Sequence, residues 1–345
     1  MHTNQTIYIE APARLHLGFL DLEGGLGRRF GSIGLTLEEV ATKILVSNAD
    51  SIEVIGDTTG RVEKYAENFI SRKGLSQGCR IVLSDRIPDH SGLGSGTQLA
   101  LAVGTAIAKL NKLTYTAADI ASTLNRGARS GIGIGAFQQG GFLVDAGRST
   151  ESSIPPIISR IEFPSNWRAI LVQDPDEQGI HGDEEYSSFA KLAPFSAETA
   201  AELCRLVMLQ ILPAICEQNI DLFNLGIYKL QACIGEYFAP VQGGRYTSAS
   251  VVEAITYLES QGVQGVGQSS WGPTGFAFVD SETQAHSLLR DLQNKFSNKN
   301  NLEFKVVSGR NAGALIEENN IKQEQRTEET ENSISKQDTI SGSNK

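Results

Sequence analysis

Hydrophobic and polar residues alternate in three short segments near the start of the chain, a pattern typical of half-buried β-strands. These segments are residues 6–12, 41–47 and 80–84. Residues 61–73 instead place Tyr65 and Phe69 on one face at helical spacing, and Gly74 follows directly. This spacing predicts an amphipathic helix that ends at the glycine, because glycine readily takes the left-handed conformation found after a helix C-terminus.

A helix of a different kind is predicted at residues 96–110, which are apolar nearly all round. A helix without a polar face is buried, and the small residues within it, such as Gly104, indicate close packing. Further helices are expected at 116–125, 197–218 (interrupted near Pro213), 220–237, 248–261 and 283–296, and further strands at 142–145, 168–173, 275–279 and 302–307. Strands dominate the first half and helices the second, so the predicted fold class is α+β rather than a regular doubly wound sheet.

The polar, proline-containing stretch 149–156 predicts a joint between two domains. We therefore expect an N-terminal domain of residues 1–155 and a C-terminal domain of residues 156–316. From about residue 317 the sequence consists mainly of Glu, Asn, Lys, Gln, Thr and Ser. Such a segment buries too little apolar surface to offset the entropy lost on ordering, so residues 317–345 are predicted to be a disordered tail.

Composition and charge narrow the classes of function. The chain has 345 residues, of which 40% are hydrophobic, and a formal net charge of −10. With no basic run, nucleic acid is excluded as the main partner, although local arginines can still bind a small anion. The four cysteines form no CxxC pair, which indicates free thiols in a reducing compartment. We see no signal peptide and expect no membrane-spanning segment, so the prediction is a soluble, cytoplasmic protein.

The stretch 87–98 carries the strongest chemical signal, because a glycine- and hydroxyl-rich loop opens directly into the buried helix. Glycines allow backbone N–H groups to turn toward a ligand, and the helix N-terminus adds partial positive charge. We therefore predict a phosphate-binding loop, and the alternative is a tight strand-to-helix turn without a ligand. The predicted binding residues are His90, Ser91, Gly92, Leu93, Gly94, Ser95, Gly96 and Thr97.

This loop resembles the phosphate loop of the GHMP kinase superfamily, through Pro88-x-x-x-Gly92-Leu93-Gly94-Ser95. Two other family motifs have counterparts at residues 11–18 and 262–270, and the resemblance covers nearly all of residues 1–316. It implies an N-terminal α+β domain with a left-handed βαβ crossover and a ferredoxin-like C-terminal domain.

The chain departs from these kinases where many of them carry a catalytic aspartate in a Ser-Gly-x-Asp context. Here the sequence is Ser130-Gly131-Ile132-Gly133, so a glycine stands in that place. Glycine cannot accept a proton from an alcohol, which argues against a kinase mechanism of that type. An ATP-dependent small-molecule kinase with another base, and a non-catalytic ligand-binding protein, remain as alternatives.

One branch of the superfamily, the β-ribofuranosylaminobenzene 5′-phosphate synthases, is similar to this chain in those same places. The similar stretches are residues 14–21, 24–28, 31–34, 90–98, 129–133, 140–145 and 267–273. The resemblance implies a pentosyltransferase of tetrahydromethanopterin biosynthesis. Its substrates would be phosphoribosyl pyrophosphate (PRPP) and either 4-aminobenzoate or 4-hydroxybenzoate. A C-riboside 5′-phosphate would form with loss of CO2 and pyrophosphate.

Charged residues around the glycine-rich stretches are the candidates for this chemistry. Arg14 and His16 alternate on the first strand, so their side chains share one face and we expect two cations beside the anion loop. The alternative is a solvated sheet face. Arg28 follows a glycine loop. A second glycine-rich stretch at residues 126–135 is also predicted to be a loop, and Arg126 and Arg129 flank it, where a guanidinium group suits phosphate or carboxylate. The predicted catalytic residues are Arg14, His16, Asp21, Arg28 and Arg129.

Asp21 and Asp145 are the candidates for holding Mg²⁺, which takes only one or two carboxylates and keeps waters. Each aspartate alone is equally compatible with a turn or cap. No organic cofactor is expected, and a homodimer is possible. Trp271 would stack on the substrate ring or belong to the core. The remaining predicted substrate-binding residues are Ser130, Gly131, Gln268, Ser269 and Trp271.

Overall fold

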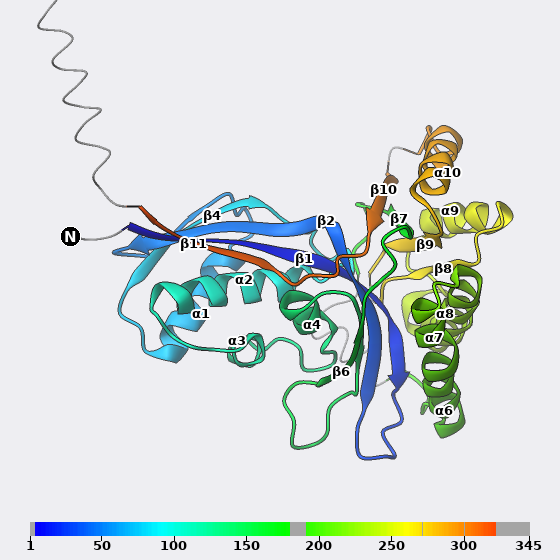
Figure 1. Ribbon diagram of the computed structural model, residues 1–345, viewed down its shortest axis with the longest axis horizontal. Coiled ribbons are helices and arrows are strands. Elements are labelled where there is room, and N and C mark those ends of the chain that lie inside the picture. The colour runs from blue at the N-terminus through cyan, green and yellow to red at the C-terminus, as the bar shows by residue number, and fades with distance from the viewer. Residues whose placement is uncertain (1–3, 180–190, 271, 300, 322–345) are drawn as a thin grey trace, which may run out of the picture.

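The computed structural model describes residues 4–179, 191–270, 272–299 and 301–321. Two β-sheets organise these residues, and Figure 1 shows the larger sheet on the left and the smaller one at the upper right. The prediction of an α+β fold is confirmed, since the described strands and helices do not alternate as in a doubly wound sheet.

The larger sheet has seven strands. They are β1 (Asn4–Asp21), β2 (Phe30–Ala49), β3 (Glu53–Ile55), β4 (Gly78–Asp85), β5 (Phe142–Asp145), β6 (Ile157–Ile161) and β11 (Leu315–Ile321). Their order is β11-β1-β2-β4-β3, with β5 paired to β2 and β6 to β5. The β1–β2 hairpin runs well beyond the short alternating segments seen in the sequence. Its outer half continues along the C-terminal helices in Figure 1, so these two strands reach both domains.

Helices α1 (Arg61–Lys73), α2 (Ser95–Leu110), α3 (Ala117–Thr123) and α4 (Ile132–Gln138) belong to this domain. Helix α1 joins β3 to β4, which run parallel, and it ends at Gly74 with φ of 63°, as the sequence predicted. Helix α2 is buried on nearly all sides between the sheet and the neighbouring helices (Figure 1), which explains why its sequence lacks a polar face. Thr116 and Asp119 form a capping box at α3.

The smaller sheet contains β7 (Arg168–Gln173), β8 (Gly265–Gln268), β9 (Gly275–Val279) and β10 (Glu303–Ser308) in the order β10-β7-β9-β8. Helix α9 (Ala249–Ser260) precedes β8, and α10 (Glu282–Lys295) connects β9 to β10. A βαββαβ chain with this antiparallel strand order has the ferredoxin-like arrangement, which confirms the architecture that the resemblance implied.

The predicted domain limits need two corrections. Strand β6 (Ile157–Ile161) pairs with β5 in the larger sheet, although the sequence placed it after the joint. The predicted tail begins at residue 317, whereas β11 continues to Ile321 and pairs with β1 over residues 4–10. A strand that lacks its own apolar run is stabilised by the hydrogen-bonding edge of its neighbour, and this edge is invisible in the local sequence.

The second glycine-rich stretch also differs from its prediction as a loop, because residues 132–138 form helix α4. The predicted helix at 197–218 is divided into α6 (Ala197–Leu206), a π-helical turn (Val207–Ile211) and α7 (Leu212–Cys216). Proline at 213 lacks an N–H, so the wider turn directly precedes it. Helix α8 (Ile220–Gln242) follows.

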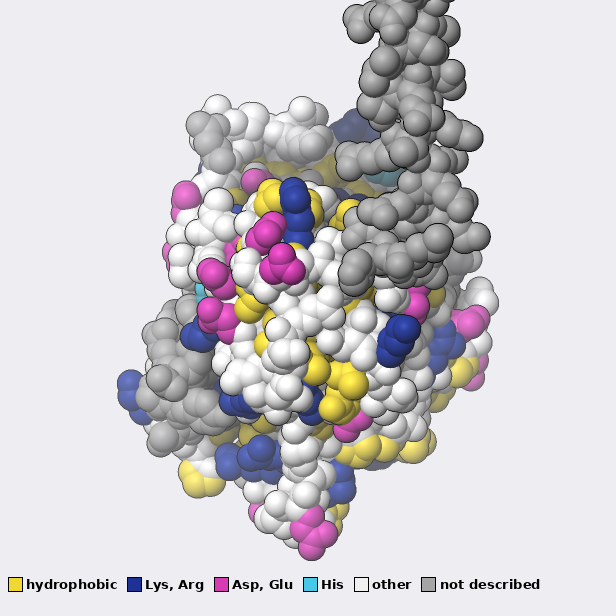
Figure 2. Space-filling model, turned by 90° about the vertical axis from the view of Figure 1, so that its left-hand side faces the viewer, with side chains coloured by type: hydrophobic (Ala, Val, Ile, Leu, Met, Phe, Trp, Pro, Cys, Tyr) yellow, Lys and Arg dark blue, Asp and Glu magenta, His cyan; other side chains and the backbone are white. Residues whose placement is uncertain are grey.

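Among the described residues, the run Ala197–Cys216 is long and apolar enough to cross a membrane, judged by length and composition only. This run departs from the expectation of no membrane-spanning segment. Leu203, Val207 and Ile211 of the run lie in the protein core against α8 and β1. Met208 and Leu209 are exposed, so the core explains only part of its apolar composition. On the face of the molecule shown in Figure 2, several acidic side chains gather at the upper left, and the basic side chains lie mainly along the lower part.

Gln231 links the two domains from α8. Its Nε2 atom donates to the carbonyl of Leu17 on β1 at 2.5 Å, and its Oε1 atom accepts from the backbone N–H of Gln268 on β8 at 2.8 Å. The side chain is 7% exposed. One amide group therefore satisfies two buried backbone groups that belong to different sheets.

Replacing this residue by a side chain of similar length, in Gln231→Met, leaves both backbone groups without a partner. We expect the free energy of unfolding to fall by about 2–4 kcal/mol, measured by urea denaturation. Gln210→Met is the matched control, because Gln210 donates to the Leu222 carbonyl in an exposed position. A loss for Gln231→Met no larger than that of the control would contradict this interdomain link.

Candidate active site

The predicted phosphate loop leads from β4 into α2 and is shaped by two glycines. Gly92 has φ of 83° and Gly94 has φ of 90°, conformations that other L-residues rarely adopt. Gly94 is the N-cap of α2 and offers no capping side chain, and the first turn contains no acidic residue. The loop therefore presents a helix N-terminus with its partial positive charge, as an anion site requires.

Arg14 on β1 lies against this loop. Its backbone N–H donates to the Leu93 carbonyl at 3.1 Å, and its Nη1 atom donates to the Gly92 carbonyl. A Cβ atom built on Gly94 would lie 3.4 Å from Arg14 Cγ. The predicted proximity of Arg14 to the phosphate loop is thus present in the structure.

The segment around Ser269 brings the C-terminal domain onto the same loop. Ser269 Oγ donates to the Gly92 carbonyl at 2.7 Å and accepts from the His16 backbone N–H at 3.1 Å. Gly272 packs directly on Gly92, so a Cβ on Gly92 would lie only 2.8 Å from the Cα of Gly272. Both positions need glycine because the two backbones are in contact.

His16 differs from its prediction as a second cation. It is 3% exposed, its Nδ1 atom lies 2.8 Å from Ser270 Oγ, and its ring centroid is 4.8 Å from that of Phe19. Burial, the Arg14 guanidinium and the Arg129 guanidinium together hold the pKa of His16 well below 6.5. The imidazole is therefore neutral at physiological pH, and the positive charge beside it comes from the arginines.

Asp145 organises the second glycine-rich stretch. It is 1% exposed and accepts hydrogen bonds from the backbone N–H groups of Gly131 at 3.0 Å and Gly147 at 2.8 Å. The hydroxyls of Ser32 and Ser130 also donate to it. Burial raises the pKa of Asp145, and these donors act in the opposite direction. The carboxylate thus holds the start of α4 in place.

Asp21 and Arg28 occupy the adjoining hairpin. Asp21 accepts from the N–H groups of Glu23 and Gly24, each at 2.9 Å, and so closes a turn. Arg28 donates to the carbonyls of Ala146 at 3.0 Å and Gly147 at 2.9 Å, directly after Asp145. Both side chains support the backbone of this region.

The predicted Mg²⁺ site at Asp21 and Asp145 stays a prediction. The carboxylates of Asp21 and Asp145 already accept hydrogen bonds from protein groups. Across the described residues, no group of three or more His, Cys, Asp or Glu side chains could hold a metal ion. We therefore derive no step through a protein-bound metal.

Gly133, which the motif resemblance matches to the kinase aspartate, packs against Thr97 in the first turn of α2. A Cβ built on it would lie 3.0 Å from Thr97 Cγ2, and its carbonyl accepts from Gln98 Nε2 at 2.7 Å. Helices α2 and α4 therefore pack closely at this point. A side chain here would require Thr97 to move by a few tenths of an ångström, so the packing favours glycine at this position.

The other predicted residues are distributed as follows. Ser91 Oγ donates to the Pro88 carbonyl at 2.8 Å, and the His90 carbonyl accepts from Gly179 N–H at 3.0 Å with His90 at φ of 57°. Ser95, Gly96 and Thr97 form the first turn of α2. Gln268 Oε1 accepts from Thr247 N–H at 2.7 Å, so it supports the neighbouring backbone. Trp271 lies outside the described residues.

Several residues of this region were not predicted as site residues, although Ser32 and Ser270 lie within the similar stretches 31–34 and 267–273. Ser32, Ser270 and Gln231 contact predicted site residues from distant parts of the chain. Arg61 does too: a Cβ built on Gly96 would lie 2.9 Å from Arg61 Nη2 and 3.5 Å from Arg126 Nη1. Single serines and arginines carry no local signal of such contacts, which only the fold creates.

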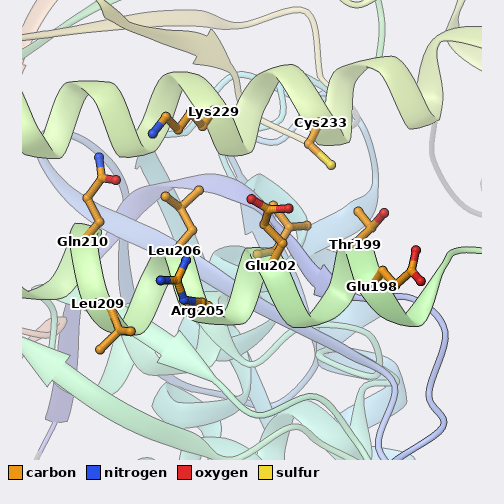
Figure 3. A pocket seen from close by; sticks show the side chains of 10 residues that line it. Glu198, Thr199, Glu202, Arg205, Leu206, Leu209, Gln210, Lys229 and Cys233 are labelled. Atoms are coloured by element: carbon orange, nitrogen blue, oxygen red, sulfur yellow. The ribbon is translucent and has the colours of Figure 1, made fainter.

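A cavity of 620 Å³ lies elsewhere, between α6 and α8. Figure 3 shows Lys229 and Cys233 on one helix facing Thr199, Glu202 and other side chains of the opposite helix. None of the predicted site residues lines it. It therefore has no part in the site described above.

Asp145→Asn tests the supporting role of this carboxylate. The two backbone N–H groups of Gly131 and Gly147 donate to different oxygens of the carboxylate. In the amide, an NH2 group replaces one of these oxygens, so one N–H loses its acceptor, and the other keeps only an uncharged one. We expect a loss of about 1–3 kcal/mol in the free energy of unfolding. Thermal and urea denaturation measure it, with Asp176→Asn as an exposed control. Equal stability of wild type and Asp145→Asn would rule the role out.

The neutral state of His16 predicts a pH dependence of stability. Its pKa is lowered in the folded protein, whereas the unfolded chain has the ordinary value near 6.5. As pH falls below that value, the unfolded state binds a proton that the folded state does not, so stability decreases. The slope attributable to His16 approaches about 1.4 kcal/mol per pH unit. Replacing His16 by Asn should flatten the wild-type slope between pH 7 and 5. An unchanged slope would show that His16 takes up a proton in the folded protein as readily as in the unfolded chain.

Comparison with known proteins agrees with this architecture and site. Residues 60–141 match the model of the GHMP kinases N terminal domain, and residues 211–298 match that of the GHMP kinases C terminal domain. The crystal structure of mevalonate-3-kinase from Thermoplasma acidophilum is similar, with a TM-score of 0.62 and 14% identity. The match covers 91% of this chain and 99% of that one, and at this identity it shows the fold alone.

Two curated relatives are named β-ribofuranosylphenol 5′-phosphate synthase. The protein from Archaeoglobus fulgidus is 32% identical over 90% of this chain and 99% of its own length. The protein from Methanocaldococcus jannaschii is 37% identical over 79% of this chain and 90% of its own length. These relatives confirm the resemblance seen in the motifs and indicate that the chain is an enzyme. The chain therefore belongs to the β-ribofuranosylphenol 5′-phosphate synthase family and has the GHMP kinase fold.

Proposed function

We propose that this enzyme joins the ribosyl group of PRPP to 4-hydroxybenzoate, with release of CO2 and pyrophosphate. The observation that carries the proposal is the close relationship to three proteins whose name specifies a ribofuranosylphenol 5′-phosphate product. The sequence alone left 4-aminobenzoate and 4-hydroxybenzoate open. A phenol product requires a hydroxyl group opposite the carbon that is ribosylated, and this favours 4-hydroxybenzoate.

The bond changes of this reaction balance without an external acid or base. The bond between sugar C1 and the pyrophosphate oxygen breaks, and its electron pair leaves with pyrophosphate. The ring carbon that bears the carboxylate then forms a carbon–carbon bond to C1. Finally the bond to the carboxylate breaks, its electrons restore the aromatic ring, and CO2 leaves. The residues must therefore stabilise the charges that develop and orient the two substrates. These two effects are large enough to supply most of a rate enhancement.

The phosphate loop suits the leaving pyrophosphate. Its glycines and the N-terminus of α2 offer backbone N–H groups and partial positive charge. Arg14 lies directly beside the loop, and Arg129 is close enough to lower the pKa of His16. We assign both arginines to the negative charge that develops on pyrophosphate as the C1–O bond breaks.

The replacement of the kinase aspartate by Gly133 agrees with this division of tasks. A carboxylate beside Thr97 would repel both pyrophosphate and the benzoate. A phosphotransfer to an alcohol needs such a group to accept or orient the proton, whereas the proposed condensation does not.

Purified enzyme incubated with Mg²⁺ in the buffer, PRPP and carboxyl-labelled 4-hydroxybenzoate tests the proposal. We expect labelled CO2 and pyrophosphate in equal amounts, with 4-aminobenzoate as a second acceptor for comparison. Turnover only with ATP and an alcohol would instead identify a kinase. Binding of PRPP without turnover would identify a ligand-binding protein.

Arg14→Ala tests the assignment of the loop. We expect kcat/KM for PRPP to fall by about 10²–10³-fold, as is usual when a group that stabilises developing negative charge is removed. Arg72→Ala is the matched control, because Arg72 on α1 is exposed and contacts only the end of α3 and the residues after it in the hydrogen bonds described. Thermal denaturation of both variants verifies folding. Near-normal turnover of a folded Arg14→Ala protein would remove Arg14 from the site.

A further inference from the structure

Ser270 contacts His16 at one ring nitrogen and at its backbone carbonyl, and these contacts guide the assignment of the imidazole proton. Ser270 Oγ lies 3.3 Å from the His16 carbonyl oxygen, to which it donates, and 2.8 Å from His16 Nδ1. The His16 carbonyl also accepts from the Ser270 backbone N–H at 3.0 Å. We assign the one hydroxyl hydrogen of Ser270 to that carbonyl, and in this assignment Ser270 accepts from Nδ1–H. In a neutral imidazole the other nitrogen, Nε2, then has a free electron pair and is a hydrogen-bond acceptor.

This acceptor is buried and lacks a partner. Nε2 has no hydrogen bond to any described residue, and the whole side chain is 3% exposed. A buried acceptor without a donor costs about 1–3 kcal/mol, and native proteins seldom retain one without a reason. Burial and the nearby charges of Arg14 and Arg129 keep the ring from taking up a proton instead. The missing donor is thus a neutral O–H or N–H group.

The position of His16 restricts which substrate group this is. His16 lies two residues from Arg14, and Ser269 connects its backbone N–H to the Gly92 carbonyl of the phosphate loop. A donor that reaches Nε2 therefore belongs to the part of the substrate nearest to the bound diphosphate. This restriction depends on the proposed function, in which the loop holds the pyrophosphate of PRPP.

The stereochemistry of the sugar then selects the hydroxyl. In an α-ribosyl diphosphate, the 2-hydroxyl is on the same face of the ring as the diphosphate. The relatives form a β-ribofuranosyl product, so the aromatic ring approaches C1 from the opposite face. The side of the sugar that faces the loop and His16 therefore carries the 2-hydroxyl, and the benzoate lies across the sugar.

We propose that His16 Nε2 accepts a hydrogen bond from the 2-hydroxyl of the ribosyl diphosphate. This contact orients C1 toward the benzoate. It also leaves more electron density on O2, next to the carbon that becomes positively charged as pyrophosphate departs. A neutral acceptor stabilises that charge, whereas an imidazolium would oppose it. In this proposal His16 is a catalytic residue that hydrogen-bonds to the sugar, and it does not bind the phosphates.

Two variants separate this contact from the structural role of the ring. His16→Asn keeps an N–H donor in reach of Ser270, in the place of Nδ1, and removes the acceptor at Nε2. His16→Gln extends an amide oxygen to the position of Nε2. Each is assayed with PRPP and with its 2-deoxy analogue, and thermal denaturation shows whether each is folded.

We expect the wild-type kcat/KM to be roughly 10- to 100-fold higher for PRPP than for the 2-deoxy analogue, the usual range for a buried polar group left without its partner. In His16→Asn the kcat/KM for PRPP should fall toward the value for the 2-deoxy analogue, so that the ratio of the two approaches one. His16→Gln should restore part of the preference for PRPP. The KM for 4-hydroxybenzoate should stay the same in both variants.

A folded His16→Asn enzyme that prefers PRPP as strongly as wild type would overturn the inference while leaving the proposed function intact. So would a change confined to the KM for 4-hydroxybenzoate, since His16 would then contact the aromatic ring. Absence of any turnover of PRPP by the wild-type enzyme would overturn the proposed function, and this inference with it.

Discussion

The contact between Gly92 and Gly272 is the constraint on which the site depends. Two backbones approach so closely here that a single Cβ atom on either glycine would be too near. Because of this contact, Ser269 hydrogen-bonds to the Gly92 carbonyl and to the backbone N–H of His16. Ser270 contacts the imidazole ring of His16. The phosphate loop, β1 and the C-terminal domain are thereby held in one arrangement. Gln231 secures it from behind by joining β1 to β8.

The electrostatics of the site depend on two residues that carry no charge, Gly133 and His16. Gly133 provides no carboxylate beside the loop, and His16 contributes no charge. Arg14 and Arg129 are then the charged groups next to the imidazole. Positive charge is therefore not offset here by a carboxylate at the position of Gly133 or opposed by a protonated His16. In the proposed function, the GHMP kinase fold holds phosphate groups without the carboxylate that the kinase resemblance would lead one to expect.

The carboxylates near the site act on the backbone. Asp145 receives N–H groups from both sides of the turn that leads into α4, and Arg28 binds the carbonyls of that same turn. Asp21 closes the adjoining hairpin. Their hydrogen bonds show that these residues support the backbone, and their role as metal ligands stays a prediction. Acceptors already filled by backbone donors are positioned to stabilise a loop.

Local sequence was sufficient for the features that depend on neighbouring residues. The limits of α1, the buried character of α2, the capping box at α3 and the glycine-rich loop before α2 all follow from side chains within a few positions of each other. Tertiary structure alone decided the pairing of β11 with β1, the length of the β1–β2 hairpin and the contact of His16 with Ser270, which are 254 residues apart. The physical reason is that helix propensity and capping depend on residues within one or two helical turns. Strand pairing, burial and the protonation of an imidazole depend instead on groups that are distant in sequence and that the fold brings into contact.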